Sequence, residues 1–585
     1  MDHHKDWEKK RQHAFQLLSW STFLVMVVAL FVIVVITTKC GMTDPKVVQH
    51  PPQTLPSPVA STSPSPGASQ SPAPECSKVT FEDIKPMIEK KCASCHPGFS
   101  KYEIAAKGIS EWIRRVGLSA NDPRRMPKFP APELSVDEKA ELQKWKDDGL
   151  IRDENCQAQT GGRLIDIDYI ETSILADLSG VEREDQPFVR YLVVSDLADP
   201  SVGKQAIDKL LNSLVSKSRD ITLVSVVDQK KSLLRFDLRT YEMERFHWLQ
   251  IEAKDRLNFV SKTNKGKTIQ TLVLTRKPWM HARNFIEVVT NESQIYYDIL
   301  KTPHDFLDLA AKLDVDYDDD LKDLRATLIG TNQSPLTTQK NRLISRHESL
   351  DGFFWTTYDI APGGDNLFNN PLLEATRSKR VFKFEASEVI YSLPNGLMGF
   401  ALYNADGKRQ NEAPVEVVRD YQSPVFPAPV IVNPVSCFRC HGGGILETKD
   451  EVRQHVVANG SEFNVDDIER VKSLYKRDES NRVLFSLDNK KYAAALLKLN
   501  ILKDQPDPIS VVRDDFRLNW NSSKIASFLF LSEDRFIERL NQSDILREQI
   551  GQLLTGGNVT FDQLVDALPD IIKEFKLFEE LQNGE

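Results

Sequence analysis

Two short segments of this chain combine residue types that could bind a flat organic cofactor. Residues 92–96 read CASCH and residues 437–441 read CFRCH, so each is a C-x-x-C-H pentad. On a helical turn, residues i, i+3 and i+4 share one face, which lets both thiols and the imidazole meet one ligand. This pentad is the attachment signal for haem c, in which the thiols bond to the porphyrin and the imidazole ligates iron. The predicted attachment residues are Cys92, Cys95, Cys437 and Cys440, and the predicted iron ligands are His96 and His441.

Two other chemistries also use C-x-x-C pairs. Two such pairs could hold one zinc ion as a four-cysteine site, but these two lie in distant parts of the chain and each is followed directly by histidine. A thioredoxin-like redox motif requires a strand before the pair and a helix after it, a context that neither pair has. Covalent attachment of two haems explains both pentads better than zinc or disulfide exchange does.

The remaining three of the seven cysteines are Cys40, Cys76 and Cys156. Cys76 and Cys156 stand on either side of the first pentad. In an oxidising compartment a disulfide is the simplest fate for two such thiols. Closing a loop of this length could stabilise the fold by about 4 kcal/mol in the chain-entropy model. We treat this pairing as a hypothesis.

Residues 17–38 form an uncharged apolar run, LLSWSTFLVMVVALFVIVVITT. At about 1.5 Å per residue the run is long enough to cross a hydrocarbon core of about 30 Å. Basic residues precede it, so we expect residues 1–16 to form a cytoplasmic tail and the rest to be exported to the periplasmic side of the inner membrane. The alternatives are a cleaved signal peptide and lipidation at Cys40, for which Lys39 is a poor neighbour. Residues 39–75 are rich in proline and serine and predict an unfolded linker.

Residues 76–156 predict a small helical domain around the first pentad. A helix with apolar spacing leads into the pentad, and Ser135 and Glu138 form a capping box at the start of a later helix. The segment resembles class I cytochrome c domains, which place the pentad helix first and the axial methionine in an extended loop. The resemblance implies that Met126 is the second ligand of the first haem. A thioether ligand raises the haem potential, so this haem should have the higher potential.

Residues 160–435 predict a region of mixed helices and strands. Residues 163–178 and 204–216 have helical patterns, whereas residues 221–241 predict a strand pair. Residues 387–410 predict strands joined by turns at residues 394–396 and 405–407. Residues 436–585 contain the second pentad and are mainly helical after it. The predicted fold class is a multidomain chain with an N-terminal transmembrane helix, a small all-α domain and a large α+β region with a helical C-terminal part.

The stretch from about residue 163 to the end resembles large, poorly characterised bacterial c-type cytochromes. The resemblance is carried by RYLVVSDL, NRLISRHES, EVIYSLPNGLMGFALYNADGKRQNEAP and SCFRCH. It implies haem binding without indicating a substrate. For the second ligand of the second haem we favour His347, because a neighbouring carboxylate could orient its imidazole. His281 and Met398 are the next candidates, and an open position is a further alternative.

The composition of the chain argues against nucleic-acid binding. The net charge of −9 gives no electrostatic attraction to phosphate backbones. The acidic run at residues 314–320 lacks the glycine and glutamate of a calcium loop and predicts a helix start. We expect a membrane-anchored di-haem cytochrome c that transfers electrons to redox partner proteins not identifiable from sequence. The alternatives are a di-haem peroxidase-like enzyme that uses the second haem, and a haem-based redox sensor.

Overall fold

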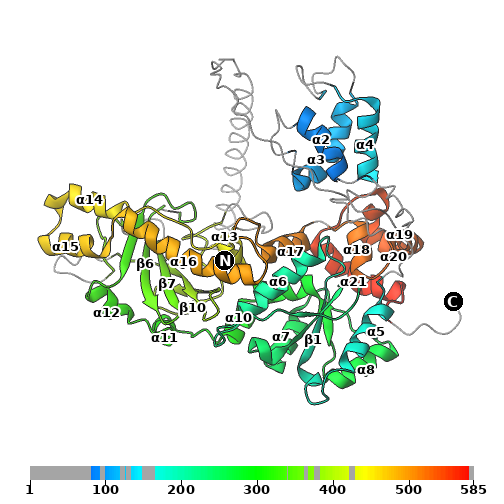
Figure 1. Cartoon of the computed structure of the whole chain (residues 1–585), viewed down its shortest axis with the longest axis horizontal. Coiled ribbons are helices and arrows are strands. Elements are labelled where there is room, and N and C mark those ends of the chain that lie inside the picture. Colours follow the sequence, from blue (N-terminus) through cyan, green and yellow to red (C-terminus); the bar gives the residue numbers. More distant parts are fainter. Residues whose placement is uncertain are drawn as a thin grey trace, which may run out of the picture. The chain divides into compact units, whose positions relative to one another are not determined.

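The computed structural model describes residues 165–578 except 339, 361–365, 374–381, 421–428 and 519, together with residues 79, 81–92, 99, 101–118, 125–126 and 133–147. The chain divides into two compact units, Met1–Ala158 and Gln159–Glu585. Figure 1 shows the chain coloured along its sequence. Each unit has an apolar core of its own.

The described part of the smaller unit is helical. Its core surrounds Trp145, which is fully buried and whose ring centre lies 5.6 Å from that of Phe81. The capping box that the sequence predicts is confirmed: the Glu138 amide donates to the Ser135 hydroxyl (3.1 Å), and the Ser135 amide donates to the Glu138 carboxylate (2.6 Å). The helices of this unit are α2 (Phe81–Lys91), α3 (Tyr102–Val116) and α4 (Val136–Asp147).

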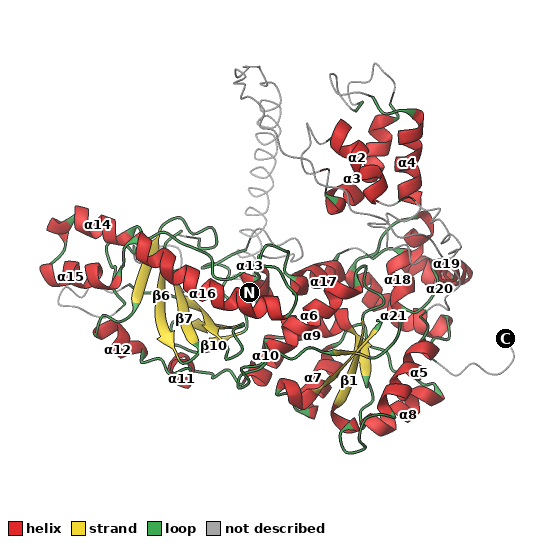
Figure 2. Cartoon of the chain, viewed as in Figure 1, coloured by secondary structure: helices red, strands yellow, loops and turns green. Residues whose placement is uncertain are grey.

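The described residues of the larger unit form two β-sheets, drawn in yellow in Figure 2. The first sheet has the strand order β2-β3-β1-β4, in which β1 pairs antiparallel with β3 and parallel with β4. The predicted strand pair at residues 221–241 is confirmed as β2 and β3. The strands are β1 (Val189–Val193), β2 (Ser225–Val226), β3 (Leu233–Asp237) and β4 (Trp279–His281).

The second sheet is an antiparallel meander with the order β10-β9-β8-β7-β6-β5. Both predicted turns are confirmed, because residues 394–396 join β8 to β9 and residues 405–407 join β9 to β10. Gly396 has a φ of 90°, a conformation that glycine adopts without steric cost. The strands are β5 (Thr327–Thr331), β6 (Arg342–Ser349), β7 (Gly352–Asp359), β8 (Ala386–Ser392), β9 (Met398–Asn404) and β10 (Arg409–Gln410).

Helices cover the sheets of the larger unit on several sides. The predicted helices at residues 163–178 and 204–216 are confirmed as α5 and α6. The helices are α5 (Ile167–Leu178), α6 (Pro200–Asn212), α7 (Arg245–Lys254), α8 (Asn264–Val273), α9 (Ala282–Asn291), α10 (Ser293–Leu300), α11 (Phe306–Lys312), α12 (Tyr317–Lys322), α13 (Val435–His441), α14 (Val452–Ala458), α15 (Val465–Leu474), α16 (Asp478–Lys498), α17 (Pro508–Arg517), α18 (Ser522–Phe528), α19 (Glu533–Gln542), α20 (Asp544–Ile550) and α21 (Phe561–Glu574).

The two faces of the six-stranded sheet have different neighbours. On one face, Phe485 of α16 stacks on Trp355 of β7 with ring centres 4.8 Å apart. On the other face, Phe306 of α11 contacts Phe354, the residue that precedes Trp355 in β7. Successive side chains of a strand point to opposite faces, so the register of this sheet decides which residues can meet α13 and α16.

The predicted fold class is wrong with respect to its membrane-spanning helix. Among the described residues, no helix is both long and apolar enough to cross a membrane. Even α16, which has 21 residues, carries Asp488, Lys490 and Lys491 near its middle. The predicted span at residues 17–38, its cytoplasmic tail and the linker lie outside the described residues. The described chain is a mixture of helices and two sheets. The predicted inner-membrane location depended on the membrane-spanning helix and is not retained.

Candidate functional site

The second pentad lies on α13, a short helix that begins after Pro434. One helical turn carries Cys437, Cys440 and His441 along the same side of this helix. Cys437 is fully enclosed and belongs to the main apolar core, together with Phe438. The pentad is therefore part of the packed interior of the larger unit, and its side chains have fixed neighbours.

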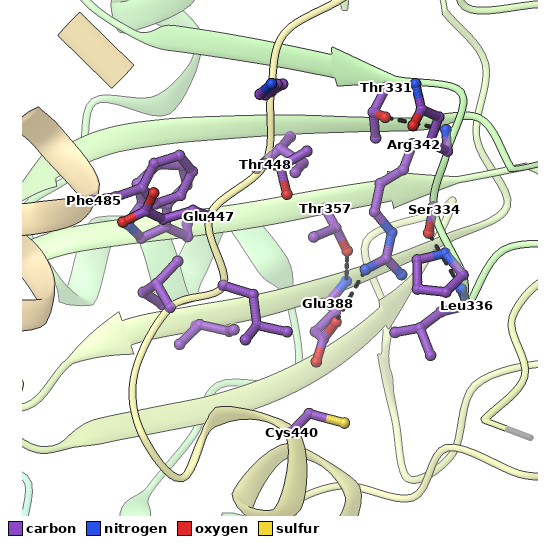
Figure 3. Close-up of a pocket in the computed structure, with 18 of the residues that line it drawn as sticks. Thr331, Ser334, Leu336, Arg342, Thr357, Glu388, Cys440, Glu447, Thr448 and Phe485 are labelled. Atoms are coloured by element: carbon purple, nitrogen blue, oxygen red, sulfur yellow. Dashed lines mark hydrogen bonds and ion pairs between the residues drawn. The ribbon is translucent and has the colours of Figure 1, made fainter. Parts of the chain in front are cut away.

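Beside α13 lies a cavity of about 610 Å³. Its floor is the face of the six-stranded sheet that meets α16, and the segment after the pentad closes one side. Cys440 and His441 both line it. Figure 3 shows Cys440 on its helix, with Arg342 and Glu388 projecting from the sheet toward each other. A volume of this size lies within the range of about 300–1,000 Å³ that cofactor sites occupy.

His441 presents one ring nitrogen to this cavity. Its Nδ1 donates a hydrogen bond to the carbonyl oxygen of Gly444 (3.2 Å). Its Nε2 lies 4.0 Å from a carboxylate oxygen of Glu388, which also lines the cavity. Burial lowers the pKa of the His441 imidazole, which favours the neutral ring. A neutral imidazole whose Nδ1 is held by a backbone carbonyl offers the Nε2 lone pair to a metal.

The loop after the pentad fixes the carbonyl that orients His441. Gly444 has a φ of 127°, which side-chain-bearing residues rarely adopt. A Cβ atom added there would lie 2.3 Å from the Asn489 side-chain oxygen. Asn489 of α16 also accepts a hydrogen bond from the Ile445 amide (2.7 Å) and donates one to its carbonyl (3.0 Å). Helix α16 therefore determines the position of the His441 acceptor.

The surroundings of the two pentad thiols favour their protonated form. Cys437 and Cys440 are free cysteines. Burial raises the pKa of both thiols, and the nearby Glu388 carboxylate raises it further. A redox-active C-x-x-C pair needs a lowered thiol pKa instead. The geometry gives no support to the thioredoxin-like alternative.

Charged side chains of the sheet are held close to the pentad. Arg342 donates two hydrogen bonds to the Asp359 carboxylate (2.7 and 2.8 Å) and lies 3.9 Å from Glu388. Glu388 is only 12% exposed. Sequence reasoning missed Glu388, because an acidic residue within a strand pattern carries no signal by itself. The available clue was its spacing from Ile390: the two residues are two positions apart in a strand, so they point to the same face.

His347 lies on the opposite face of the sheet from His441. In β6, Arg342 and Ile344 line the cavity, and His347 is an odd number of residues from Ile344. Its Nδ1 is 3.0 Å from Asp320 of α12, and its ring lies 4.6 Å from that of Tyr317. Burial lowers the pKa of His347. The structure does not bring this residue to the second pentad, so the favoured ligand assignment has no geometric support.

Replacing His347 with glutamine is expected to leave the spectrum of a haem at the second pentad unchanged, because the imidazole is on the other side of the sheet. The variant should lose about 1–3 kcal/mol of unfolding free energy, since the buried contact with Asp320 is disturbed. Absorption spectra and urea unfolding measure the two effects. A changed ferric spectrum in a variant of normal stability would restore His347 as a ligand.

The other two candidates for that position are also placed away from the cavity. His281 ends β4 in the four-stranded sheet, where its Nδ1 lies 3.0 Å from the fully buried Asp196. Met398 begins β9 and is buried in the main apolar core. Neither residue lines the cavity beside α13. The sequence suggested His281 and Met398 as ligands because a sequence does not show which side chains line the same cavity.

The first pentad is only partly within the described residues. Cys92 follows the end of α2, is half-buried and packs against the helical core. The Met126 amide donates to the Arg115 carbonyl at the end of α3 (3.2 Å). Cys95 and His96 lie outside the described residues, as do Cys76 and Cys156 of the hypothetical disulfide. Ligation by His96 and Met126 stays a prediction.

The prediction of metal binding is wrong for an ion held by side chains alone. In the part of the chain that the structure describes, no three His, Cys, Asp or Glu residues are grouped so that they could hold a metal ion. The zinc alternative needs both C-x-x-C pairs, and Cys95 of the first pair lies outside the described residues, so this alternative stays untested. Helix α12 begins at Tyr317 within the acidic run, with Asp318, Asp319 and Asp320 in its first turn, which confirms the helix-start interpretation of that run. Haem iron needs at most two ligands from the protein, so the lack of a group of three such residues does not test haem binding.

No family model matches this chain, and no curated protein or solved structure is significantly similar to it. The cytochrome resemblances noted from the sequence therefore stay untested. The case for a function rests on the side chains around the second pentad.

Proposed function

We propose that this chain is a di-haem cytochrome c that transfers electrons, with haems attached at residues 92–96 and 437–441. The observation that carries the proposal is the state of His441. Its Nδ1 is bound to a backbone carbonyl, while its Nε2 faces a cavity of about 610 Å³ that Cys440 also lines. These are the requirements for an imidazole that ligates haem iron beside a thioether bond.

The walls of this cavity suit a porphyrin. Apolar contacts come from Ile344, Trp355 and Ile390 on the sheet, which exclude water from an aromatic macrocycle. Polar groups lie among the same lining residues. They include Lys449, whose charge could meet a propionate. A bound haem supplies one-electron chemistry, and the protein supplies ligands and surroundings.

Each group of the pentad has a separate role in this proposal. Cys437 and Cys440 hold the cofactor covalently, so it cannot dissociate when the iron changes charge. His441 ligates the iron and is kept in one tautomer by Gly444. Because buried apolar side chains enclose Cys437, solvent reorganisation during electron transfer is limited. The arrangement serves a carrier, for which the iron needs shielding more than access.

The proposal predicts two porphyrins per chain that survive denaturation. The chain is expressed with a haem c maturation system, denatured, extracted with acidified solvent and assayed for haem. Cys437→Ala/Cys440→Ala should retain one haem, and Cys92→Ala/Cys95→Ala should also retain one. The two variants serve as controls for each other, with circular dichroism to verify folding. A wild-type chain that keeps no porphyrin after extraction contradicts the proposal.

A further inference from the structure

The second haem, if bound as proposed above, needs a group on the side of the iron opposite His441. Among the described residues that line the cavity, His441 is the single histidine and no methionine is present. The two ligand types that sequence reasoning expected are therefore absent from the described lining. The closest candidate is a carboxylate.

Glu388 lies at the right distance from His441 for an axial pair. The separation between His441 Nε2 and Glu388 Oε1 is 4.0 Å. Imidazole nitrogen and carboxylate oxygen each bind a transition metal at about 2.0–2.2 Å, so ligands on opposite sides of one ion are about 4.0–4.4 Å apart. Neighbouring positions of an octahedron would bring the two atoms to about 3 Å. The observed distance matches the opposed arrangement.

The strand register holds Glu388 in this position. It sits in the middle of β8, opposite Thr357 of β7 and Leu402 of β9. Its amide also donates to the Thr357 hydroxyl (3.4 Å). Since a strand with neighbours on both sides cannot rotate, the side chain of Glu388 must point to the face that α13 covers.

The two carboxylate oxygens of Glu388 have different neighbours. Oε2 is 3.9 Å from the Arg342 guanidinium, whereas Oε1 faces His441 and lies 3.8 Å from the Cys437 thiol. Arg342 already donates two hydrogen bonds to Asp359. The Glu388 carboxylate therefore has only the distant Arg342 guanidinium and the weak Cys437 thiol donor as partners. These contacts compensate little for the cost of burying a carboxylate. A bound cation next to Oε1 would complete its environment.

We propose that Glu388 is the axial ligand of the second haem on the side opposite His441. A carboxylate is a hard, anionic ligand that stabilises ferric iron over ferrous iron. The second haem then has the lower potential and the haem with the predicted Met126 ligand has the higher one.

The test is spectroscopic and uses the full chain with both haems. The wild type should give a high-spin ferric signal from one haem by electron paramagnetic resonance. In a redox titration, Glu388→Gln should keep two haems per chain and raise the reduction potential of the second haem, because the anionic ligand is lost. Glu388→His should convert the same haem to a low-spin bis-imidazole spectrum. The matched control is Glu348→Gln, since Glu348 lies on the same sheet, is 78% exposed and does not line the cavity, so the spectrum and the potential should be unchanged.

The outcomes separate this inference from the function on which it rests. A chain without covalent haem contradicts the proposed function. Two covalent haems, with an unaltered potential in Glu388→Gln and an unaltered spectrum in Glu388→His, contradict the ligand assignment alone. If Glu388→Gln reduces haem content, the histidine variant still decides, because only a side chain that faces the iron can produce the bis-imidazole spectrum.

Discussion

Replacing Asp488 with alanine is expected to lower the free energy of unfolding by about 3–5 kcal/mol, because the change leaves the buried Arg346 guanidinium without its buried carboxylate partner. Asp488 on α16 accepts hydrogen bonds from Arg346 Nε (2.9 Å) and Nη2 (3.0 Å), and from the Trp355 indole (2.8 Å). Both members of the ion pair are less than a tenth exposed. The pair joins α16 to the sheet that forms the floor of the cavity.

Glu348 provides a matched control for Asp488. It also pairs with Arg346 (2.5 Å), but its side chain is 78% exposed. A surface ion pair is worth about 0–1 kcal/mol, so Glu348→Ala should have a small effect. Urea unfolding of the two variants, followed by circular dichroism, measures the difference. Equal effects would mean that Arg346 reaches solvent when its buried partner is removed.

The same ion pair connects stability to the proposed haem site. Phe485 lies one helical turn before Asp488 and lines the cavity, and Asn489 follows directly and holds the loop after the pentad. A loosened α16 therefore displaces both the wall and the carbonyl that orients His441. Haem occupancy at the second site should fall in Asp488→Ala, while occupancy at the first site stays unchanged.

Local patterns in the sequence predicted the local structure well. The hairpin from β8 to β9 was predictable because a Pro-Asn-Gly turn separates two apolar runs. The start of α4 was predictable from Ser135 and Glu138, since a capping box needs only three residues of separation. Helix geometry alone places Cys437, Cys440 and His441 on one side of α13. These features depend on contacts within a few residues.

The partners of the pentad could not be predicted in the same way. His347 and Glu388 lie on different strands, and only the register of the whole sheet shows that one faces away from α13 and the other toward it. A shift of one residue would exchange those two faces. The neighbouring Glu348 suggested an oriented imidazole, but Asp320, which is distant in sequence, is the carboxylate that holds His347. Long-range pairing of this kind leaves no pattern in a single sequence.

Replacing Gly444 with alanine is expected to reduce haem binding at the second pentad, although the pentad itself is unchanged. The added Cβ would lie 2.3 Å from the Asn489 side-chain oxygen, and the φ of 127° is unfavourable for alanine. We expect a loss of about 2–4 kcal/mol in unfolding free energy, the sum of backbone strain and overpacking. The loop must move to relieve the overlap, so its carbonyl leaves His441.

Gly443→Ala is the control, because the preceding glycine is exposed and its φ is not positive. A Cβ there would lie 3.4 Å from the Lys503 carbonyl oxygen, an ordinary contact. Haem per chain and the ferric spectrum, measured side by side, distinguish the two variants. We expect the Gly444 variant to lose second-site haem several-fold and the Gly443 variant to retain it. If both keep full occupancy, His441 does not depend on the Gly444 carbonyl for its orientation, and the observation that supports haem ligation at this pentad loses its force.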